Sequence, residues 1–190
     1  MMEENFNGIK IEIYRSNRKT ISIELKADRL IVRAPHRMSD QEVHAFVHKK
    51  KAWIVKHQQQ MLERQEIIRQ QGMYTLEELS ELAEKALVVI PEKVKHYAPL
   101  VGVDYGRITI RSQRTRWGSC SGKGNLNFNC LLMLLPDEVI NSVVVHELCH
   151  RKHMNHSVQF YAEVERVFPE YKRWNRWLNE NGGRYLSRLQ

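Results

Sequence analysis

The sequence predicts an α+β protein, in which N-terminal β-strands and a long helix come before a second, mostly helical part. Three observations support this fold class. Apolar and polar residues alternate with a period of two within 9–34, which is typical of half-buried strands. Apolar residues then recur at helical spacing over 40–70 and again over 75–90. Short alternating segments return at 107–111 and 126–129, ahead of another apolar helix.

The length of 190 residues predicts one domain, or one domain with an appendage. We place the boundary at Gly72, so that 1–72 hold the first strands and the long helix, and 73–190 hold the core. Five prolines and nine glycines exclude collagen-like and low-complexity chains, and hydrophobic residues at 42% with charged residues at 27% are an ordinary globular balance. The longest apolar run, 130–135, is far shorter than the ~20 residues that cross a bilayer. We therefore expect no membrane partner.

The net charge of +8 is concentrated near the start of the chain. Residues 1–72 hold 14 Lys and Arg against 9 Asp and Glu, a net charge of 14 − 9 = +5. An anionic partner would benefit from this excess, although basic solvated surfaces are also common. The three cysteines have no paired spacing, and the first residues lack the pattern of a secretory signal, so we do not expect one. We therefore expect a reducing, cytoplasmic location.

The N-terminal elements are predicted from periodicity and capping residues. Three apolar groups follow one another: Ile9, Ile11 and Ile13; Ile21, Ile23 and Leu25; Leu30, Ile31 and Val32. They predict a half-buried antiparallel meander. Ser39 and Glu42 have the spacing of a capping box, in which each side chain bonds the other's backbone N–H. A helix from about residue 40 to 70 is therefore expected, with a solvated second half.

A second capping box, Thr75 with Glu78, begins the core. An apolar helical face follows until Pro91, which removes a helical hydrogen bond, so we expect a kink or a restart there. This segment should end near Gly102. The remaining elements are predicted in order: a strand over 107–111, a Gly- and Ser-rich loop over 118–124, a strand over 126–129, a helix opened by Pro136, a helical region from Ser157 to Pro169, and a short C-terminal helix around 174–178.

The segment His146-Glu147-Leu148-Cys149-His150 carries the clearest chemistry. Two histidines four residues apart lie on one face of a helix, one turn apart. Their rings can converge on one zinc ion at ~2.0–2.1 Å. Zinc lowers the pKa of a bound water from ~15.7 toward ~7, and Glu147 is placed to take the proton as the water attacks.

A catalytic zinc needs a third protein ligand and an open fourth position. His153 and His156 both follow the motif. His153 would continue the same rigid helix and overshoot the ion, so we expect it at the surface or behind a ligand. His156 lies far enough beyond His150 for the helix to end and the chain to turn back. We therefore predict zinc ligation by His146, His150 and His156.

Several motifs together resemble the YgjP-like metallopeptidase family. The matching segments are Arg114-Thr115-Arg116-Trp117-Gly118-Ser119-Cys120-Ser121, Gly124-Asn125-Leu126-Asn127-Phe128-Asn129, 143–150, and Asn155-His156-Ser157 with Phe160. That family is related to the SprT-like and Spartan proteases and more distantly to the zincins. The resemblance implies a zincin-like α+β core, with a small antiparallel sheet packed against the active-site helix. It assigns zinc to the same three histidines and the general-base role to Glu147.

Other site roles are less specified by the pattern. The transition state needs a donor for its oxyanion, and Arg114, Arg116 and Tyr161 are candidates. Arg116 comes first because it belongs to the loop motif, although these arginines could instead make structural pairs. Asn127 and Asn129 could line a substrate or form a solvated strand face.

The function predicted first is a zinc-dependent metallohydrolase, a metallopeptidase that acts on a peptide or protein. One alternative is a zinc hydrolase of a nucleotide phosphoanhydride, because the same activated water could attack phosphorus. Another is a nucleic-acid-associated binding protein with a regulated protease site, although the chain has no recognisable nucleic-acid motif. The sequence leaves the oligomeric state open.

Overall fold

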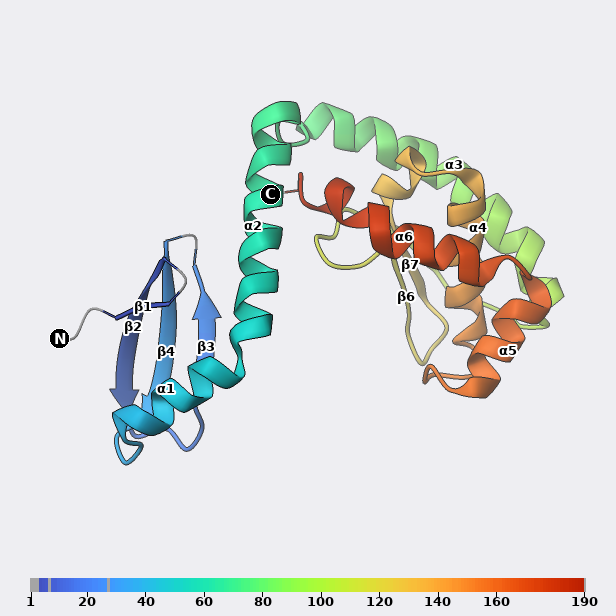
Figure 1. The fold of residues 1–190 in the computed structure, drawn as a ribbon. Helices are drawn as coiled ribbons and strands as arrows, with labels where there is room; N and C mark the ends of the chain where they lie inside the picture. The colour runs from blue at the N-terminus through green and yellow to red at the C-terminus, as the bar shows by residue number, and fades with distance from the viewer. Residues whose placement is uncertain (1–3, 7, 27, 190) are drawn as a thin grey trace. The chain divides into compact units, whose positions relative to one another are not determined.

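The computed structural model describes residues 4–6, 8–26 and 28–189. The chain divides into two compact units, Met1–Glu66 and Ile67–Gln190, and each has a hydrophobic core of its own (Figure 1). The division falls within helix α2 (Lys51–Gln71), a few residues before Gly72. The boundary proposed at Gly72 stays a prediction.

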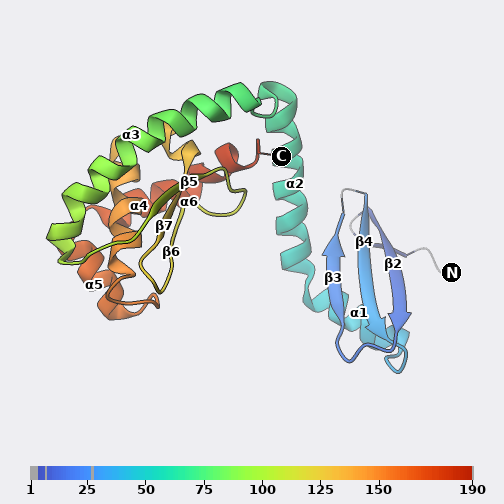
Figure 2. The ribbon, with the colours of Figure 1, turned by 180° about the vertical axis from the view of Figure 1, so that it is seen from behind.

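The first unit is a four-stranded sheet followed by helices. Its elements are β1 (Glu4–Phe6), β2 (Ile9–Ser16), β3 (Ser22–Leu25), β4 (Arg29–Pro35), α1 (Asp40–Lys49) and the start of α2. The strand order is β1-β2-β4-β3, and β2 runs parallel to β4 (Figure 2). The predicted antiparallel meander is therefore wrong. Leu30, Val32 and Ala34 of β4 are fully buried, whereas all of β3 is half-buried, so the most apolar strand takes the central position.

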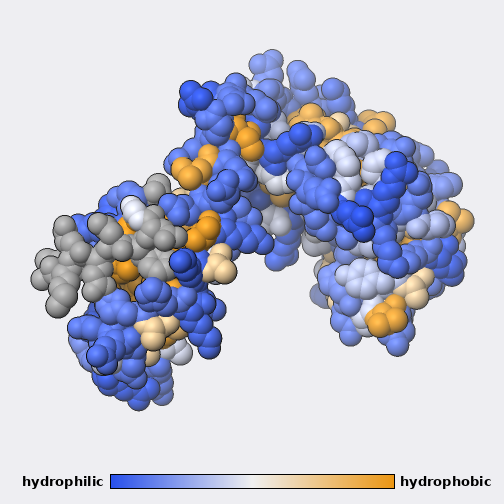
Figure 3. All heavy atoms as spheres, in the orientation of Figure 1, coloured by the Kyte–Doolittle hydropathy of each residue, from blue (hydrophilic) through white to orange (hydrophobic). Residues whose placement is uncertain are grey.

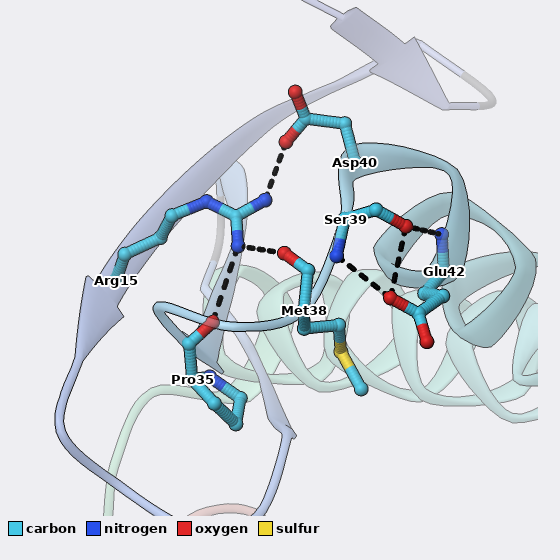
Figure 4. A network of polar contacts seen from close by, with 6 residues as sticks. All are labelled: Arg15, Pro35, Met38, Ser39, Asp40 and Glu42. Atoms are coloured by element: carbon cyan, nitrogen blue, oxygen red, sulfur yellow. Dashed lines mark hydrogen bonds and ion pairs between the residues drawn. The ribbon is translucent and has the colours of Figure 1, made fainter.

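Arg15 ties the end of the sheet to the first helix (Figure 4). Its guanidinium donates to the carbonyl oxygen of Pro35 at 3.2 Å and to that of Met38, and it forms an ion pair with Asp40. These contacts satisfy carbonyl groups in the turn between β4 and α1. They therefore hold the helix start against the sheet of the same unit.

The helix predicted over 40–70 is two helices. The capping box of Ser39 and Glu42 is present at the start of α1, as predicted. The chain then breaks at Lys50, which has φ −95° and ψ 7°, and α2 follows. Nothing in the sequence marks this break, because Lys50 is neither glycine nor proline. Ile54 is the one buried residue of α2, so the solvated second half is confirmed.

The second unit combines a small sheet with helices. Its elements are α3 (Leu76–Val101), β5 (Ile108–Arg111), β6 (Gly118–Cys120), β7 (Leu126–Asn129), the 3-10 helix η1 (Cys130–Leu134), α4 (Asp137–Cys149), α5 (Val158–Val167) and α6 (Tyr171–Leu186). The capping box of Thr75 and Glu78 and the end at Gly102 are confirmed. Helix α3 continues through Pro91, so a restart there is wrong. Its fully buried positions repeat at helical spacing across the proline, and this packing outweighs one missing hydrogen bond.

The sheet of the second unit has the order β5-β7-β6. Strand β5 runs parallel to the central β7, and β6 runs antiparallel to it, so the sheet is mixed rather than antiparallel as predicted. Strand β6 also occupies part of the segment predicted as a loop, 118–124. Its pairing with β7 uses the backbone, which a Gly- and Ser-rich sequence supplies without any side-chain pattern. The α+β class itself is confirmed.

Helix α4 is the centre of this unit, and it contacts α3, α5, α6 and β6. Val143, Val144 and Val145 are buried just before the histidine motif, and Pro136 is the N-cap, as predicted. Helix α5 begins after Ser157, and α6 follows Pro169. Helix α6 has 16 residues and is longer than the short helix predicted.

The face of the molecule in Figure 3 is mainly hydrophilic, with hydrophobic residues in small separate groups. Within the part of the chain that the structure describes, none of the helices combines the length and the apolar character that a bilayer span requires.

Candidate metal centre

Three histidine rings converge at the end of α4. The Nε2 atom of His146 lies 3.2 Å from Nε2 of His150 and 3.1 Å from Nε2 of His156. One ring nitrogen from each histidine lies within 4.8 Å of the corresponding nitrogens of the other two. The structure therefore brings together the three residues for which the sequence predicts zinc ligation.

The end of α4 explains why the third ring is His156. His150 is the C-cap of α4, and the backbone N–H of His153 donates to the carbonyl of Cys149 as the chain leaves the helix. The chain then turns back and begins α5 after Ser157, the N-cap. His153 is not part of the triad, but its carbonyl oxygen lies 3.0 Å from Nδ1 of His150. His153 therefore contacts the predicted ligand His150 through its backbone carbonyl, on the ring nitrogen that does not face the triad.

The donor set fits one zinc ion. A carbonyl can only accept, so Nδ1 of His150 carries the hydrogen and its Nε2 lone pair faces the other two rings. Tetrahedral ligands at about 2.0–2.1 Å from zinc lie roughly 3.3 Å apart, close to the observed spacing of the Nε2 atoms. A cation between these nitrogens would remove the electrostatic repulsion between their lone pairs.

Burial favours the neutral form of His146 and of His150, which is the form that binds metal. Burial, together with smaller contributions from the neighbouring His150 and His156, lowers the pKa of His146 to about 3. Burial also lowers the pKa of His150, against the opposing effect of its bond to the carbonyl of His153.

Glu147 is a buried carboxyl group with an unsatisfied oxygen. Its side chain is 5% exposed, and Oε2 has no hydrogen-bond partner within 4–6, 8–26 and 28–189. Burial raises the pKa of Glu147 to about 8, and the charge of Arg116 acts in the opposite direction. A cation held by the adjacent triad would act in the same direction as Arg116 and favour the carboxylate.

Strand β6 packs its backbone directly against this carboxyl group. A Cβ atom built on Gly118 would lie 2.6 Å from Oε1 of Glu147 and 2.7 Å from its Cγ. No side chain fits in that space without displacement. The glycine of the Arg-Trp-Gly-Ser-Cys motif therefore lets the edge of the sheet approach the predicted general base.

The segment before β6 is held by a buried asparagine. Asn129 is 1% exposed, and its Nδ2 donates to the carbonyl oxygens of Gln113 at 2.7 Å and Arg116 at 2.9 Å. Its Oδ1 accepts from the backbone N–H of Leu131. Asn129 was expected either to line a substrate or to lie on a solvated strand face. Both expectations are wrong, because its side chain is buried and its amide is hydrogen-bonded to backbone groups. Asn127 is half-buried and bonds Arg111 and Ser119.

Two aromatic residues near the triad were not given roles from the sequence. The ring of Phe160 lies 4.6 to 5.0 Å from the rings of all three histidines. The hydroxyl of Tyr171 lies 2.8 Å from Nδ1 of His146. Phe160 is only four residues after His156 and could have been inferred, but Tyr171 is 25 residues from its partner His146 and carries no local signal.

Comparison with known families decides the identity of the chain. The YgjP-like metallopeptidase domain matches residues 19–81 and 76–181. The chain belongs to the YgjP-like family. Family membership makes it a hydrolase of the metallopeptidase class, which implies a bound metal, and the histidine triad is the fitting site.

Two solved structures are similar to this YgjP-like chain. The metallopeptidase zymogen abylysin of Pyrococcus abyssi is 26% identical, with a TM-score of 0.45, over 50% of this chain and 96% of that one. The metallopeptidase zymogen jannalysin of Methanocaldococcus jannaschii is 20% identical, with a TM-score of 0.43, over 48% of this chain and 94% of that one. No curated protein matches the chain significantly.

Proposed function

We propose that this protein is a zinc-dependent metallopeptidase in which His146, His150 and His156 hold the metal and Glu147 is the general base. One observation carries the proposal: three histidine rings converge at the end of α4, and the residue next to His146 in that helix has a buried carboxyl oxygen without a hydrogen-bond partner in the described part of the chain. This is the donor set and the neighbouring acid that the zincin type of peptidase uses.

The bound zinc would act as a Lewis acid toward the water and the scissile carbonyl. Glu147 takes one proton from the attacking water as the new C–O bond forms. It then delivers that proton to the leaving amide nitrogen as the C–N bond breaks, so no other proton donor is needed. Arg116 is exposed, and its charge already acts on the pKa of Glu147, so it is placed to stabilise negative charge near that carboxyl group.

The chain's thiols suit a reducing compartment. Cys120, Cys130 and Cys149 are all free, and burial raises the pKa of each thiol, which keeps them unreactive. We therefore place the enzyme in the cytoplasm.

The proposal is tested by metal content and peptide hydrolysis on the same preparations. The wild-type protein should hold about one zinc per chain and degrade an unfolded protein such as casein. Glu147→Gln should keep the zinc and lose hydrolysis, because the amide cannot take the proton. His153→Ala is the matched control, since it removes an adjacent imidazole but keeps the carbonyl that His150 uses. Hydrolysis that persists in Glu147→Gln, or in zinc-free folded protein, would overturn the assignment.

A second candidate concerns anionic partners of the first unit. Residues 43–62 hold four lysines and no Asp or Glu. A hollow of about 780 Å³ is lined by Lys49, Lys51 and Lys56 together with His48, Ala52, Val55 and Gln59. This surface favours a phosphate-rich molecule such as a nucleic acid that localises the peptidase. A nucleotide phosphoanhydride would instead be a substrate of the metal centre in the second unit.

This second candidate is tested with nucleoside triphosphates and with a labelled DNA strand at two salt concentrations. Changing Lys49, Lys51 and Lys56 to Glu should weaken DNA binding strongly, whereas Lys19→Glu, Lys85→Glu and Lys95→Glu together give the same net charge elsewhere. Phosphate release that Glu147→Gln abolishes would favour the nucleotide. Equal binding by both triple variants would remove the lysine surface from consideration.

A further inference from the structure

The hydroxyl of Tyr171 is the one side-chain group outside the triad that hydrogen-bonds a triad nitrogen in the described part of the chain. We propose that Tyr171 is a positioning residue, which holds the His146 ring so that Nε2 presents a lone pair to the metal. The inference rests on the proposed function, because it needs the triad to be the metal site.

Burial separates this role from a catalytic one. Tyr171 is 4% exposed, and its hydroxyl lies 2.8 Å from Nδ1 of His146, so it has no access to substrate. Tyr161 lies beside the same cluster but is 39% exposed, and its ring centroid is 6.1 Å from that of His156. Tyr161 therefore faces outward, whereas Tyr171 acts only through His146.

Metal ligation through Nε2 would select one tautomer of His146, and the Tyr171 hydroxyl can pair with that tautomer. A tyrosine hydroxyl can donate or accept, so it can pair with either neutral form of the ring. When Nε2 is a metal ligand, the hydrogen must lie on Nδ1, and the Tyr171 oxygen is then the acceptor. His150 achieves the same arrangement with the carbonyl of His153. Each predicted ligand on α4 is thus oriented through its Nδ1 atom, His150 by a backbone carbonyl and His146 by a side-chain hydroxyl.

Ring packing fixes the geometry of this pair. The rings of His146 and Tyr171 are stacked, with centroids 6.0 Å apart and planes at 24°. Phe160 meets the His146 ring edge-on at 4.9 Å. Tyr171 begins α6, so the C-terminal helix supplies the contact that orients a ligand on α4. Groups that orient metal-bound histidines in this way raise metal affinity about 10- to 100-fold.

The test is zinc affinity of the full chain, measured by competition with a chromophoric chelator. Tyr171→Phe keeps the ring and its stacking but removes the acceptor, and we expect zinc affinity to fall by at least about tenfold. Two variants are matched controls. Tyr74→Phe removes another buried hydroxyl, which makes no hydrogen bond to the described residues. Tyr161→Phe removes the hydroxyl of an exposed tyrosine beside the histidine cluster. Both should keep zinc affinity within about twofold.

The outcomes separate the positioning role from the metal assignment. His146→Ala should abolish tight zinc binding, and if it does not, the metal site itself is wrong. If His146→Ala loses zinc while Tyr171→Phe binds it like the wild type, the positioning role is wrong and the metal site stands. A loss shared equally by Tyr171→Phe and Tyr74→Phe would show a general packing effect and would also overturn the inference.

A second measurement needs no variant of Tyr171. Nitrogen-15 NMR of histidine-labelled wild-type protein reports which ring nitrogen carries the hydrogen. In the zinc-loaded protein, His146 should show a protonated, hydrogen-bonded Nδ1 and a metal-bound Nε2. Zinc on Nδ1 of His146 would contradict the proposal even if Tyr171→Phe failed to fold.

Discussion

At the scale of single residues, the chemistry depends on how closely a strand approaches a carboxyl group. Gly118 has no side chain where Glu147 lies, and a methyl group there would come within 2.6 Å of Oε1. We expect Gly118→Ala to displace the Glu147 carboxyl group while leaving the three histidines in place. Zinc content should stay the same, and peptide turnover should fall by about a hundredfold, since small misplacements of a reacting group have such effects.

The control for this variant is Gly183→Ala in α6, because a Cβ atom at Gly183 meets nothing within 4 Å. Zinc content and initial rates on one peptide substrate should be measured for both. Turnover of Gly118→Ala equal to that of Gly183→Ala would mean that Glu147 does not need the space beside β6.

Asn129 gives a residue-scale prediction about stability. Replacing it with Ala leaves the carbonyls of Gln113 and Arg116 and the N–H of Leu131 without their partner. Because the Asn129 side chain that makes all three bonds is buried, we expect the free energy of unfolding in urea to fall by about 2–4 kcal/mol. Asn127→Ala, at a half-buried position on the same strand, should lower it by less than about 1 kcal/mol. Equal effects would contradict the role assigned to Asn129.

The sequence supports local inferences about the site better than distant ones. The histidine spacing within one helix and the nearby turn to His156 suffice to predict the triad. The buried amide of Asn129 and the contact of Tyr171 with His146 depend on which segments fold next to each other. Such pairings leave no periodic mark on either partner, so residue patterns alone could not predict them.

At the scale of elements, capping residues predicted helix starts correctly, because a cap is a contact within four residues. Both predicted capping boxes are present. Strand order was not predictable in this way. Alternation shows that a segment has one buried face, but it does not say whether its neighbour runs parallel or antiparallel. A prediction based on sequence order therefore missed two parallel pairs, β2 with β4 and β5 with β7.

Helix α5 is anchored by one carboxylate with two cations. Glu163 accepts from Lys152 at 2.7 Å and from Arg166 at 2.8 Å, and its side chain is 15% exposed. The Arg166 and Lys152 hydrogen bonds lower the pKa of Glu163 to about 2. The folded state therefore binds this proton less readily than the unfolded state, so the interaction stabilises the protein above about pH 4.5, the ordinary pKa of a glutamate, and is lost toward pH 2.

We expect Glu163→Gln to lower the free energy of unfolding by about 1 kcal/mol at pH 7. The difference from wild type should shrink as the pH falls below about 4.5 and should vanish near 2. Urea unfolding across this pH range measures it, with Glu180→Gln as an exposed control of equal charge. A difference that stays constant with pH would show that the carboxylate charge is not the cause.

At the scale of the whole molecule, each unit has its own core, and the contacts divide the chain within α2, between Glu66 and Ile67. The boundary at Gly72 stays a prediction. The end of α2 is tied to the C-terminal segment of the second unit. Arg188 donates to the carbonyl oxygens of Gln71 at 3.1 Å and Gly72 at 2.9 Å, and the N–H of Tyr74 donates back to the carbonyl of Arg188. The boundary predicted at Gly72 rests on the glycine that follows α2, and the carbonyl of that glycine accepts a hydrogen bond from Arg188.

Two truncated chains distinguish these boundaries. Residues 67–190 should fold alone and bind zinc, because they keep the core, the triad and both carbonyl acceptors of Arg188. Residues 73–190 lose both acceptors, and we expect their free energy of unfolding to be lower by about 1–2 kcal/mol. Arg188→Met is the internal control: it should destabilise the longer piece by about that difference and hardly affect the shorter one. Equal stability of the two pieces, or an Arg188→Met effect of the same size in both, would mean that the end of α2 contributes nothing to the second unit and would favour the boundary at Gly72.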